Sequence, residues 1–504
     1  MTTQLPARAA AAQVRPPATA TAAATPSRPA PSAARLSSGP LLTGWGRSTS
    51  SRAAAVVVPR TVSELADALR SADGRAVLAR GAGRSYGDAA LCADGLVVDM
   101  TSLEPQVSLD SRSGLLVAAA GTTFGDVLRV SLPQGWVPPV IPGTSAVTLG
   151  GAVAADVHGK NHPTAGSFGH HVRWLVLLDA AGTRSVLTPD GTPERFWATT
   201  GGLGLTGIVV TVALQLRPIT SAGALTRQTS GRDLGHVLGL LDDAFADSAA
   251  ADAPDPGDAG AARDAGVHAV AWLDGRARGR GIGRGIVQVT RPGGGPTGLR
   301  AARAQRARRN CRSLPGPGVV NRASIEAANL GRWLSRRDGR ERWTDLRTAL
   351  LPLDRGDAWP AAFGRAGLLQ YQFAVPHQRT DVLRSALLVL QDAGAPPALA
   401  VLKKLGPGNA APLSFPGPGW TLALDLPARW RHLGPLLERL DGIVAGAGGR
   451  VYLVKDSRLR PHTVAAMYPE LPAWAATREL MDPGRVFASD LGRRLGLVPP
   501  VGSR

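Results

Sequence analysis

Apolar and polar residues follow helix and strand periods in turn from Ala53 onward. After a short apolar strand that ends at Val58, apolar residues recur at helical spacing, and Thr61 with Glu64 forms a capping box at the start of that helix. Further apolar runs predict strands within 75–80, 95–100, 114–120, 174–182, 184–189 and 207–218, and a helix over 122–132. The pattern predicts an α+β domain of short elements.

Length and cysteine content narrow the class of protein. A chain of 504 residues allows about two to four domains. Cys92 and Cys311 are the only cysteines and lie far apart, which predicts neither a disulfide framework nor a zinc site. The histidines between 162 and 171 have only Asp156 as a nearby acid and no regular ligand spacing. We therefore expect no metal site there.

The net charge of +19 is concentrated in two segments. Residues 1–60 contribute +7 and residues 273–313 contribute +10, so together they carry 17 of the 19 charges. Neither segment interleaves aromatic residues that could stack on bases, so we do not expect nucleic-acid binding. Basic arms of this kind favour peripheral contact with a membrane surface. A basic membrane-surface or nucleic-acid adaptor without catalytic activity stays open as an alternative of another class.

The sequence predicts neither a signal peptide nor a membrane-spanning segment. Residues 1–40 lack the apolar core of a signal peptide, and we expect them to form a disordered Ala/Pro/Arg arm. The longest uncharged stretch, 130–155, is interrupted by several Pro and Gly residues and is not a transmembrane helix. We expect a protein peripheral to the cytoplasmic membrane, on a face left undetermined. Residues 242–264 hold seven Asp, and with the Arg/Gly-rich stretch they predict mobile loops near 242–313.

Three glycine-rich segments are the candidates for ligand contact. The segment 80–88 follows a predicted strand, so its backbone N–H groups can form a nest for phosphate. The segments 142–162 and 196–210 add two more glycine-rich turns. Each alone is also compatible with a tight turn between strands. None is a P-loop or a dinucleotide-binding GxGxxG at the start of a helix.

Lysine is used sparingly, because 53 of the 57 basic residues are Arg. The four lysines are Lys160, Lys403, Lys404 and Lys455. Lys is suited to work that Arg does poorly, since its compact charge can change its pKa when buried. A surface role is the alternative, above all for Lys404.

The three glycine-rich segments in this order resemble the FAD domain of the vanillyl-alcohol oxidase type. Within that type, the chain is similar to the flavin-dependent oxidase subunits of decaprenylphosphoryl-ribose 2-epimerase, an actinobacterial cell-wall enzyme. The segments that carry the likeness are HGKNHPTAGSFGHHV, LLQYQFAVP, APLSFPGPGW, YLVKDSR and DPGRVFASDL. The resemblance implies a two-domain α+β fold. Its FAD domain would be split over 41–220 and 449–504, with an inserted antiparallel-sheet substrate domain over 221–448 and FAD at their junction.

The resemblance also implies which residues contact FAD. The residues expected there are Arg80, Gly81, Ala82, Gly83, Arg84, Ser85, Tyr86, Gly87, Gly143, Thr148, Gly150, Gly151, His158, Gly159, Lys160, Asn161, Val209 and Tyr452. In many relatives of this fold, a His in the first glycine-rich loop bonds covalently to the flavin. Tyr86 stands at that position here, so we expect FAD to be bound without a covalent link.

The reaction implied by the resemblance is oxidation of the ribose 2-hydroxyl of decaprenylphosphoryl-β-D-ribose to the 2-keto sugar. It is the first half of an epimerisation that yields the arabinose donor for cell-wall arabinan, and a separate NAD(P)H-dependent reductase subunit would complete it. Lys455 is the candidate for orienting or deprotonating the hydroxyl, and His158 is the alternative base. Tyr86, Gln370, Gln372, Lys403 and Lys455 are the expected substrate contacts. Gln370 and Gln372 alternate in a strand and should share one face.

Other interpretations of these residues remain open. Gln370 and Gln372 could line an ordinary polar sheet face, and Lys455 could be an exposed partner of Asp456. Leu350 and Ala423 stand where the family can carry Tyr and Cys on the substrate side. For this reason an FAD-dependent alditol or aldonolactone oxidase is the alternative enzyme.

Overall fold

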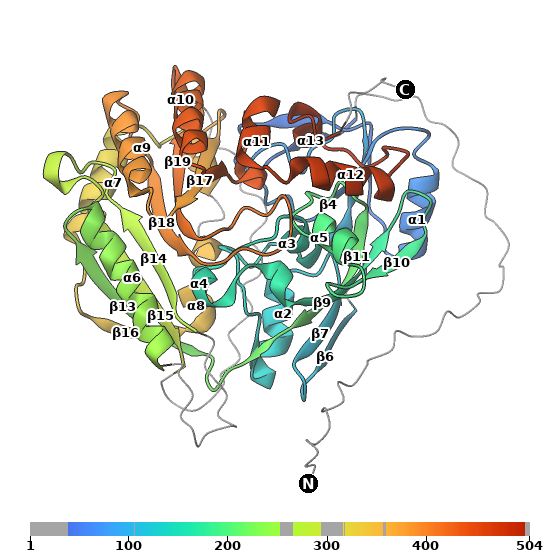
Figure 1. The fold of residues 1–504 in the computed structure, drawn as a ribbon, viewed down its shortest axis with the longest axis horizontal. Coiled ribbons are helices and arrows are strands. Elements are labelled where there is room, and N and C mark those ends of the chain that lie inside the picture. Colours follow the sequence, from blue (N-terminus) through green and yellow to red (C-terminus); the bar gives the residue numbers. More distant parts are fainter. Residues whose placement is uncertain are drawn as a thin grey trace, which may run out of the picture. The chain divides into compact units, whose positions relative to one another are not determined.

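The computed structural model describes residues 39–104, 106–251, 266–293, 316, 318–355 and 359–498. The described residues leave out 1–38 of the expected arm, and 252–265 and 294–313 of the expected loops. The described part is an α+β structure of several small sheets and one large antiparallel sheet, which confirms the expected fold class in its coarse form (Figure 1).

Two of the sheets in the first part of the chain have three or more strands, and the hydrophobic pattern predicts all of these strands except β6. A parallel sheet has the order β3-β5-β4, with β3 at Ala55–Val57, β4 at Val77–Arg80 and β5 at Leu96–Asp99. A five-stranded sheet has the order β10-β9-β11-β7-β6, with β6 at Val107–Asp110, β7 at Leu115–Ala119, β9 at Val172–Leu178, β10 at Arg184–Leu187 and β11 at Ile208–Gln215. The strands predicted within 174–182 and 184–189 are β9 and β10, which form an antiparallel hairpin.

Helix α1 (Val62–Arg70) shows how local sequence sets these elements. The Thr61 side chain accepts a hydrogen bond from the Glu64 backbone N–H at 3.1 Å, as expected of an N-cap. The Glu64 carboxylate accepts from the N–H of Arg60, one residue before the position that a capping box predicts. The helix buries Leu65 and Leu69 on its inner face.

The large sheet has eight strands in the order β16-β13-β15-β14-β18-β19-β17-β20, and all neighbours are antiparallel. The strands are β13 (Gly223–Gly231), β14 (His268–Leu273), β15 (Gly285–Pro292), β16 (Glu341–Asp345), β17 (Leu368–Pro376), β18 (Leu399–Leu405), β19 (Gly419–Pro427) and β20 (Arg450–Val451). Helices α6 (Leu234–Ala251), α9 (Thr380–Asp392) and α10 (Leu433–Gly446) pack against strands of this sheet (Figure 1).

The expectation of mobile loops near 242–313 is wrong for part of that range. Residues 242–251 belong to helix α6, and β14 and β15 also lie inside the range. Strand β15 pairs with β13 on one side and β14 on the other, so its backbone is fully used in the sheet. The Asp- and Arg-rich composition that suggested loops reflects solvent-facing positions such as Arg291, which is exposed.

The end of the chain packs back onto the first part. Helices α11 (Pro461–Met467), α12 (Leu471–Met481) and α13 (Asp490–Arg494) follow β20. The indole N–H of Trp474 donates to Ala198 O at 3.0 Å, and Val77 bridges to Phe487 beside β4. Figure 1 shows these helices, in red, next to α5 (Pro193–Thr199) and β4.

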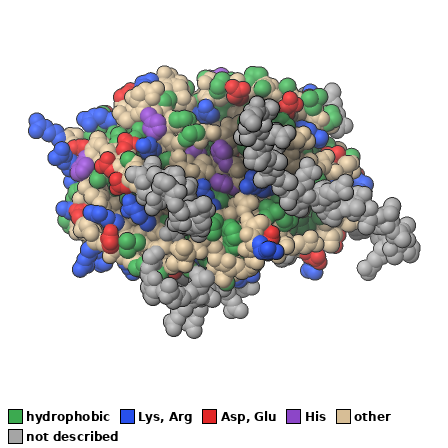
Figure 2. All heavy atoms as spheres, turned by 60° about the horizontal axis from the view of Figure 1, so that its bottom comes forward, with side chains coloured by type: hydrophobic (Ala, Val, Ile, Leu, Met, Phe, Trp, Pro, Cys, Tyr) green, Lys and Arg blue, Asp and Glu red, His purple; other side chains and the backbone are tan. Residues whose placement is uncertain are grey.

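The remaining elements are short. The strands are β1 (Leu41–Thr43), β2 (Ser50–Arg52), β8 (Trp136–Val137) and β12 (Arg217–Pro218), and the helices are α2 (Phe124–Ser131), α3 (Leu149–Ala154), α4 (His162–Ala165), α7 (Arg322–Leu334) and α8 (Leu346–Leu350). Of the helices in the described ranges, none has the length and apolar character needed to cross a bilayer. On the face in Figure 2, Lys and Arg side chains are scattered among Asp and Glu rather than gathered in one patch.

Candidate active site

The first glycine-rich loop is held in place by its own arginine. Arg80, the last residue of β4, donates to Ala90 O at 2.6 Å and to Thr43 O at 3.0 Å. Gly83 has a left-handed φ of 62°, and a Cβ at this position would overlap the Arg80 guanidinium. The guanidinium therefore fixes the curvature of the loop, and glycine is required where the loop passes over it.

The first and second glycine-rich segments lie against each other. Thr148 is the N-cap of α3, and its side chain accepts from the backbone N–H of Gly151. A Cβ on Gly81 would overlap the Thr148 hydroxyl, so the two backbones approach closely only because Gly81 lacks a side chain. Gly87 in turn touches the carbonyl of Asp456 in the YLVKDSR segment. The loop thus contacts two of the segments that the resemblance singled out.

The HGKNH turn is anchored by Asp156, a fully buried carboxylate with a φ of 39°. Asp156 accepts hydrogen bonds from the Ser167 hydroxyl (2.8 Å), the Gly169 N–H (2.9 Å), the Asn409 amide (2.8 Å) and the Ser414 hydroxyl (2.5 Å). Two of these donors lie after α4 (His162–Ala165), which follows the turn, and two lie in the connection between β18 and β19. Asp156 therefore ties the second glycine-rich segment to the large sheet.

Lys160 and the amide NH₂ group of Asn161 donate to backbone carbonyls of neighbouring segments, whereas the buried Asn161 Oδ1 has no partner in the described ranges. The Lys160 ammonium donates to the carbonyls of Ala349 (3.3 Å) and Leu350 (3.1 Å), at the C-terminal end of α8. The Asn161 amide donates to Pro139 O at 2.9 Å. Both residues therefore hold the turn against neighbouring segments.

Tyr86, Gln370 and Lys455 meet although they come from three distant parts of the chain. The Lys455 ammonium donates to Gln370 Oε1 at 2.5 Å and lies 3.9 Å from the centre of the Tyr86 ring. Gln370 Nε2 donates to the Tyr86 hydroxyl at 3.1 Å. Burial holds the pKa of the Tyr86 phenol well above 10, so this ring is a neutral donor and acceptor.

His158 and Gln372 form a second buried contact beside the first. Gln372 follows Gln370 by two residues in β17. Its Nε2 lies 3.2 Å from His158 Nε2 and donates to the Thr421 hydroxyl at 3.2 Å. The His158 ring packs near Tyr452, with ring centres 5.3 Å apart. Burial, followed by the charges of Lys403 and other cations, holds the pKa of His158 well below 6.5, so the imidazole is neutral.

Three of the four lysines, Lys160, Lys403 and Lys455, are partly buried and have lowered pKa values. Burial lowers the pKa of Lys160 to about 7, of Lys403 to about 8 and of Lys455 to about 7, and the charge of Lys403 contributes to the shifts of the other two. The neighbouring Lys404 points to the other face of β18, where it pairs with Asp242 of α6 at 2.5 Å. Because side chains alternate along a strand, Lys403 faces the candidate site, whereas its neighbour Lys404 faces helix α6.

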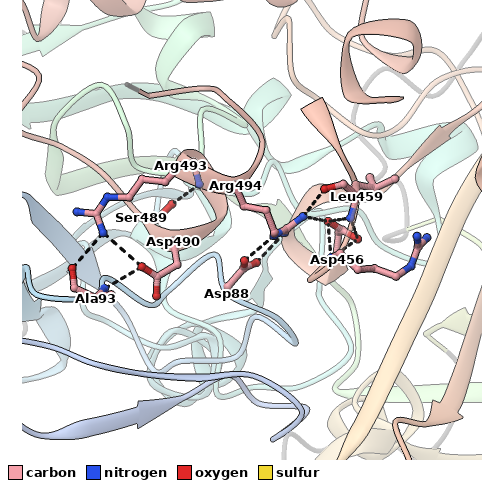
Figure 3. A network of polar contacts seen from close by, with 10 residues as sticks. Asp88, Ala93, Asp456, Leu459, Ser489, Asp490, Arg493 and Arg494 are labelled. Carbon is pink, nitrogen blue, oxygen red and sulfur yellow. Dashed lines mark hydrogen bonds and ion pairs between the residues drawn. The ribbon is translucent and has the colours of Figure 1, made fainter. Parts of the chain in front are cut away.

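Asp456 is paired with Arg494 and not with Lys455. Arg494 of α13 reaches Asp456 at 2.9 Å and also donates to Leu459 O at 2.8 Å (Figure 3). Asp456 is only 4% exposed. The interpretation of Lys455 as an exposed partner of its neighbour is thus not supported by the geometry.

Comparison with known proteins agrees with this arrangement. Residues 53–188 match the family model described as FAD binding domain. The chain is 37% identical over 472 residues to the decaprenylphosphoryl-β-D-ribose oxidase of Mycolicibacterium smegmatis, which covers 91% of this chain and 97% of that protein. The chain belongs to the decaprenylphosphoryl-β-D-ribose oxidase family. It is an FAD-dependent oxidoreductase, which confirms the expected cofactor and class of enzyme.

Two further relatives differ in how much of this chain they match. A Streptomyces coelicolor protein, described as an uncharacterized protein in mprA 5'region, is 41% identical over 74% of this chain and all of its own length. The L-gulono-1,4-lactone dehydrogenase of Mycobacterium tuberculosis is 30% identical over 40% of this chain and 46% of its own length. The likeness to the second is limited to part of each chain.

The residues present fit a flavin. Within the described ranges, the Thr122 hydroxyl, the His158 Nδ1 and the Thr200 hydroxyl are buried without a hydrogen-bond partner. They lie on or beside the glycine-rich segments, and buried polar atoms of this kind call for a bound group. Lys403 is partly buried, and among the described residues it forms no ion pair or hydrogen bond. An anionic group with several polar atoms would satisfy these residues.

The sequence missed two residues of this site. Asp425 of β19 accepts hydrogen bonds from Gln370 and from Trp359, which belongs to the short 3₁₀ helix Trp359–Phe363. A carboxylate inside the apolar strand GWTLALDLP was the available signal. Among the expected residues, Val209 on β11 packs with core residues of the five-stranded sheet. In the ranges that the structure describes, no three His, Cys, Asp or Glu side chains are grouped to hold a metal.

Proposed function

We propose that this protein oxidises the 2-hydroxyl of the ribose in a polyprenyl-phosphoryl ribose to a ketone, with decaprenylphosphoryl-β-D-ribose as the substrate. The observation that carries the proposal is the match to the Mycolicibacterium oxidase over 97% of that protein's length. Bound FAD would accept the hydride that leaves C2 of the sugar. The chain's own residues bind the sugar, orient its hydroxyl and accept the hydroxyl proton.

Lys455 is the proposed proton acceptor. A pKa of about 7 leaves a substantial fraction of the amine neutral at physiological pH, as a general base requires. The amide oxygen of Gln370 accepts a hydrogen bond from the Lys455 ammonium, and the Tyr86 ring packs against the same ammonium. Lys455 Nζ would accept the proton of the sugar 2-hydroxyl, and FAD, when bound, would supply the acceptor for the hydride from C2. His158 is the weaker candidate because Gln372 already occupies its Nε2.

Lys403, Gln370, Gln372 and Tyr86 are the proposed substrate contacts. Lys403 supports the phosphate because it is a cation without a partner among the described residues. Gln370 and Gln372 lie on one face of β17, and both are buried beside the glycine-rich segments. Their amides can hold the sugar hydroxyls or the flavin edge.

The proposed flavin cradle consists of the two glycine-rich segments and the residues behind them. It comprises residues 80–87, Gly143, Thr148, Gly150, Gly151, residues 158–161, Val209 and Tyr452. The contact of Gly81 with Thr148 supports a shared surface. FAD would be bound without a covalent link, because the Tyr86 hydroxyl is engaged by Gln370.

The proposed domain arrangement has an FAD domain split over 41–220 and 449–504, with a substrate domain over 221–448. The packing of α12 against α5 and of residue 487 beside β4 supports this division. We further propose that a separate NAD(P)H-dependent reductase completes an epimerisation, and that the protein contacts the cytoplasmic membrane peripherally. The arginine-rich segments support such contact by their charge.

Anaerobic flavin bleaching tests the proposed activity. The FAD-loaded protein is mixed with a short-chain polyprenyl-phosphoryl ribose, the corresponding arabinose epimer, xylitol or L-gulono-1,4-lactone. We expect the ribose compound to bleach the flavin at least about tenfold faster than the polyol or the lactone. A flavin that is bleached only by the polyol or the lactone would contradict the proposal.

An aldonolactone or alditol oxidase is the second candidate. The partial match to L-gulono-1,4-lactone dehydrogenase supports it. So does Ala423, an apolar residue that pairs with Gln372 across the two strands, and Leu350, whose side chain belongs to a buried apolar cluster. The lactone and polyol arms of the same experiment separate the two candidates.

A further inference from the structure

We propose that Asp425 is a positioning residue of the oxidation: acting through the amide of Gln370, it sets the orientation of Lys455 and Tyr86 in the site. This inference rests on the proposed function and adds to it a residue that does not touch the reacting atoms. Asp425 lies on β19 directly opposite Gln370 of β17 in the strand register. Its side chain faces the same side of the sheet as Gln370.

The contacts of Asp425 are complete and directional. The carboxylate is 2% exposed. One oxygen accepts from Gln370 Nε2 at 2.5 Å, and the other accepts from the Trp359 indole N–H at 2.8 Å. The Trp359 indole N–H can only donate, and the Gln370 NH₂ group donates from the other side. The side chain between them must therefore offer two acceptor oxygens, as a carboxylate does.

This acceptor decides which way the Gln370 amide points. With a carboxylate oxygen facing it, the amide must present its NH₂ group to Asp425, because the opposite orientation would bring two oxygens together. The amide oxygen then faces Lys455 and accepts from its ammonium at 2.5 Å. The same NH₂ group donates to the Tyr86 hydroxyl, whose own proton remains available to donate elsewhere.

Asp425 is also the negative charge that faces Lys455. The other titratable groups around this ammonium are Lys403 on β18, Tyr86 on the first glycine-rich loop and His158 on the HGKNH turn. Lys403 lowers the pKa of Lys455 while Asp425 raises it. Removing the carboxylate charge should lower the pKa of Lys455 further, by about one unit or more.

Substitutions at 425 and 359 separate orientation from charge. Asp425→Asn keeps the shape of the side chain but offers one oxygen to two donors, so either Gln370 or Trp359 faces an N–H group. In the double variant Asp425→Asn/Trp359→Phe, the single oxygen is free to accept from Gln370, which restores the amide orientation without the charge. Asp441→Asn is the control. It removes a buried carboxylate that accepts from Tyr371 at 3.0 Å, on the opposite face of β17.

Two measurements are made on FAD-loaded protein. The first is the anaerobic rate of flavin reduction by the polyprenyl-phosphoryl ribose across pH. The second is independent of substrate: the pH midpoint for acylation of Lys455 by a small reagent, followed by mass spectrometry. We expect Asp425→Asn to slow reduction by about tenfold to a hundredfold, the cost of a misplaced site. Its labelling midpoint should move to lower pH by about one unit or more.

The double variant should recover much of the rate while its labelling midpoint stays low, and Asp441→Asn should shift neither profile. If Asp425→Asn alone does not fold, the double variant, in which Gln370 keeps an acceptor, carries the test through its labelling midpoint, which should lie below that of the wild type. A wild-type rate and midpoint in Asp425→Asn, or a wild-type midpoint in the double variant, would overturn the inference. If the wild-type flavin is not bleached by the sugar phosphate, the proposed function fails, and the labelling midpoints still decide whether Asp425 controls Lys455.

Discussion

Arg494 and Asp88 lie 406 positions apart and are joined by two hydrogen bonds of 2.7 and 2.8 Å (Figure 3). Asp88 ends the first glycine-rich loop, and Arg494 is the final residue of helix α13. The same guanidinium reaches Asp456, directly after Lys455. One side chain therefore fixes the loop that carries Tyr86 relative to the segment that carries Lys455.

The first prediction concerns the contacts of Arg494 with Asp88 and Asp456, called here the Arg494 clamp. Arg494→Met should leave Asp88 and Asp456 buried without their cation and should lower the free energy of unfolding by about 3–5 kcal/mol. Urea denaturation of the FAD-loaded protein measures the loss. Arg493→Met is the matched control, since Arg493 bonds Ala93 O and the nearby Asp490. A loss no larger than that of the control would show that the clamp is unimportant.

The second prediction concerns the link between FAD and protein. The Tyr86 hydroxyl is engaged by Gln370, and the high pKa of this phenol keeps it from acting as a nucleophile. Acid precipitation of the loaded protein should therefore release all the FAD into the supernatant. The Tyr86→Phe variant should behave in the same way. A yellow pellet from the wild-type protein would contradict non-covalent binding.

Local pattern predicted much of the fold and only part of the site. Helix α1 and the β9–β10 hairpin depend on residues that are neighbours in sequence, so capping and alternation were sufficient. The scarcity of lysine marked Lys160, Lys403 and Lys455, because an unusual choice of residue is visible in the sequence alone.

The remainder depends on which strands lie side by side. The role of Asp425 depends on its contact with Gln370, which is 55 positions away in the sequence and directly opposite in the strand register. Composition misled the prediction near 242–251, since Asp residues on the outside of α6 resemble those of a loop. Strand order and cross-strand pairing are set by tertiary packing, which a single strand's pattern does not contain.

The third prediction uses two adjacent lysines as a test and its control. Lys403→Met should weaken binding of the sugar phosphate by about tenfold or more, the worth of a charged hydrogen bond. Binding of the dephosphorylated sugar should change little. Lys404→Met should affect neither ligand, because Lys404 pairs with Asp242 on the other face of β18. The dissociation constants of both ligands, followed by flavin absorbance, decide the matter; equal effects of the two substitutions would exclude a phosphate role for Lys403.

The fourth prediction concerns the arginine-rich beginning of the chain. Deleting residues 1–37 removes Arg8, Arg15, Arg28 and Arg35. The cut stops before Gly39 and Pro40, whose carbonyls accept from Arg52 and Ala53. Folding and flavin reduction by a short-chain substrate should survive. Binding to anionic vesicles should weaken by about 1 kcal/mol per Arg at low salt and less at high salt. Unchanged vesicle binding would remove the membrane role of this segment.

The last prediction concerns Lys455 as the proton acceptor. Because burial lowers its pKa to about 7, with Asp425 opposing and Lys403 adding to the shift, the amine is protonated and inactive below that pH and neutral above it. The rate of flavin reduction should rise with pH through about 7 and then level off. Lys455→Met should keep FAD bound, lower the rate about a hundredfold or more and abolish this inflection. A rate governed by His158 would show no inflection near 7, since the pKa of that imidazole lies well below 6.5. A Lys455→Met rate close to wild type, with the inflection intact, would transfer the role of base to another group.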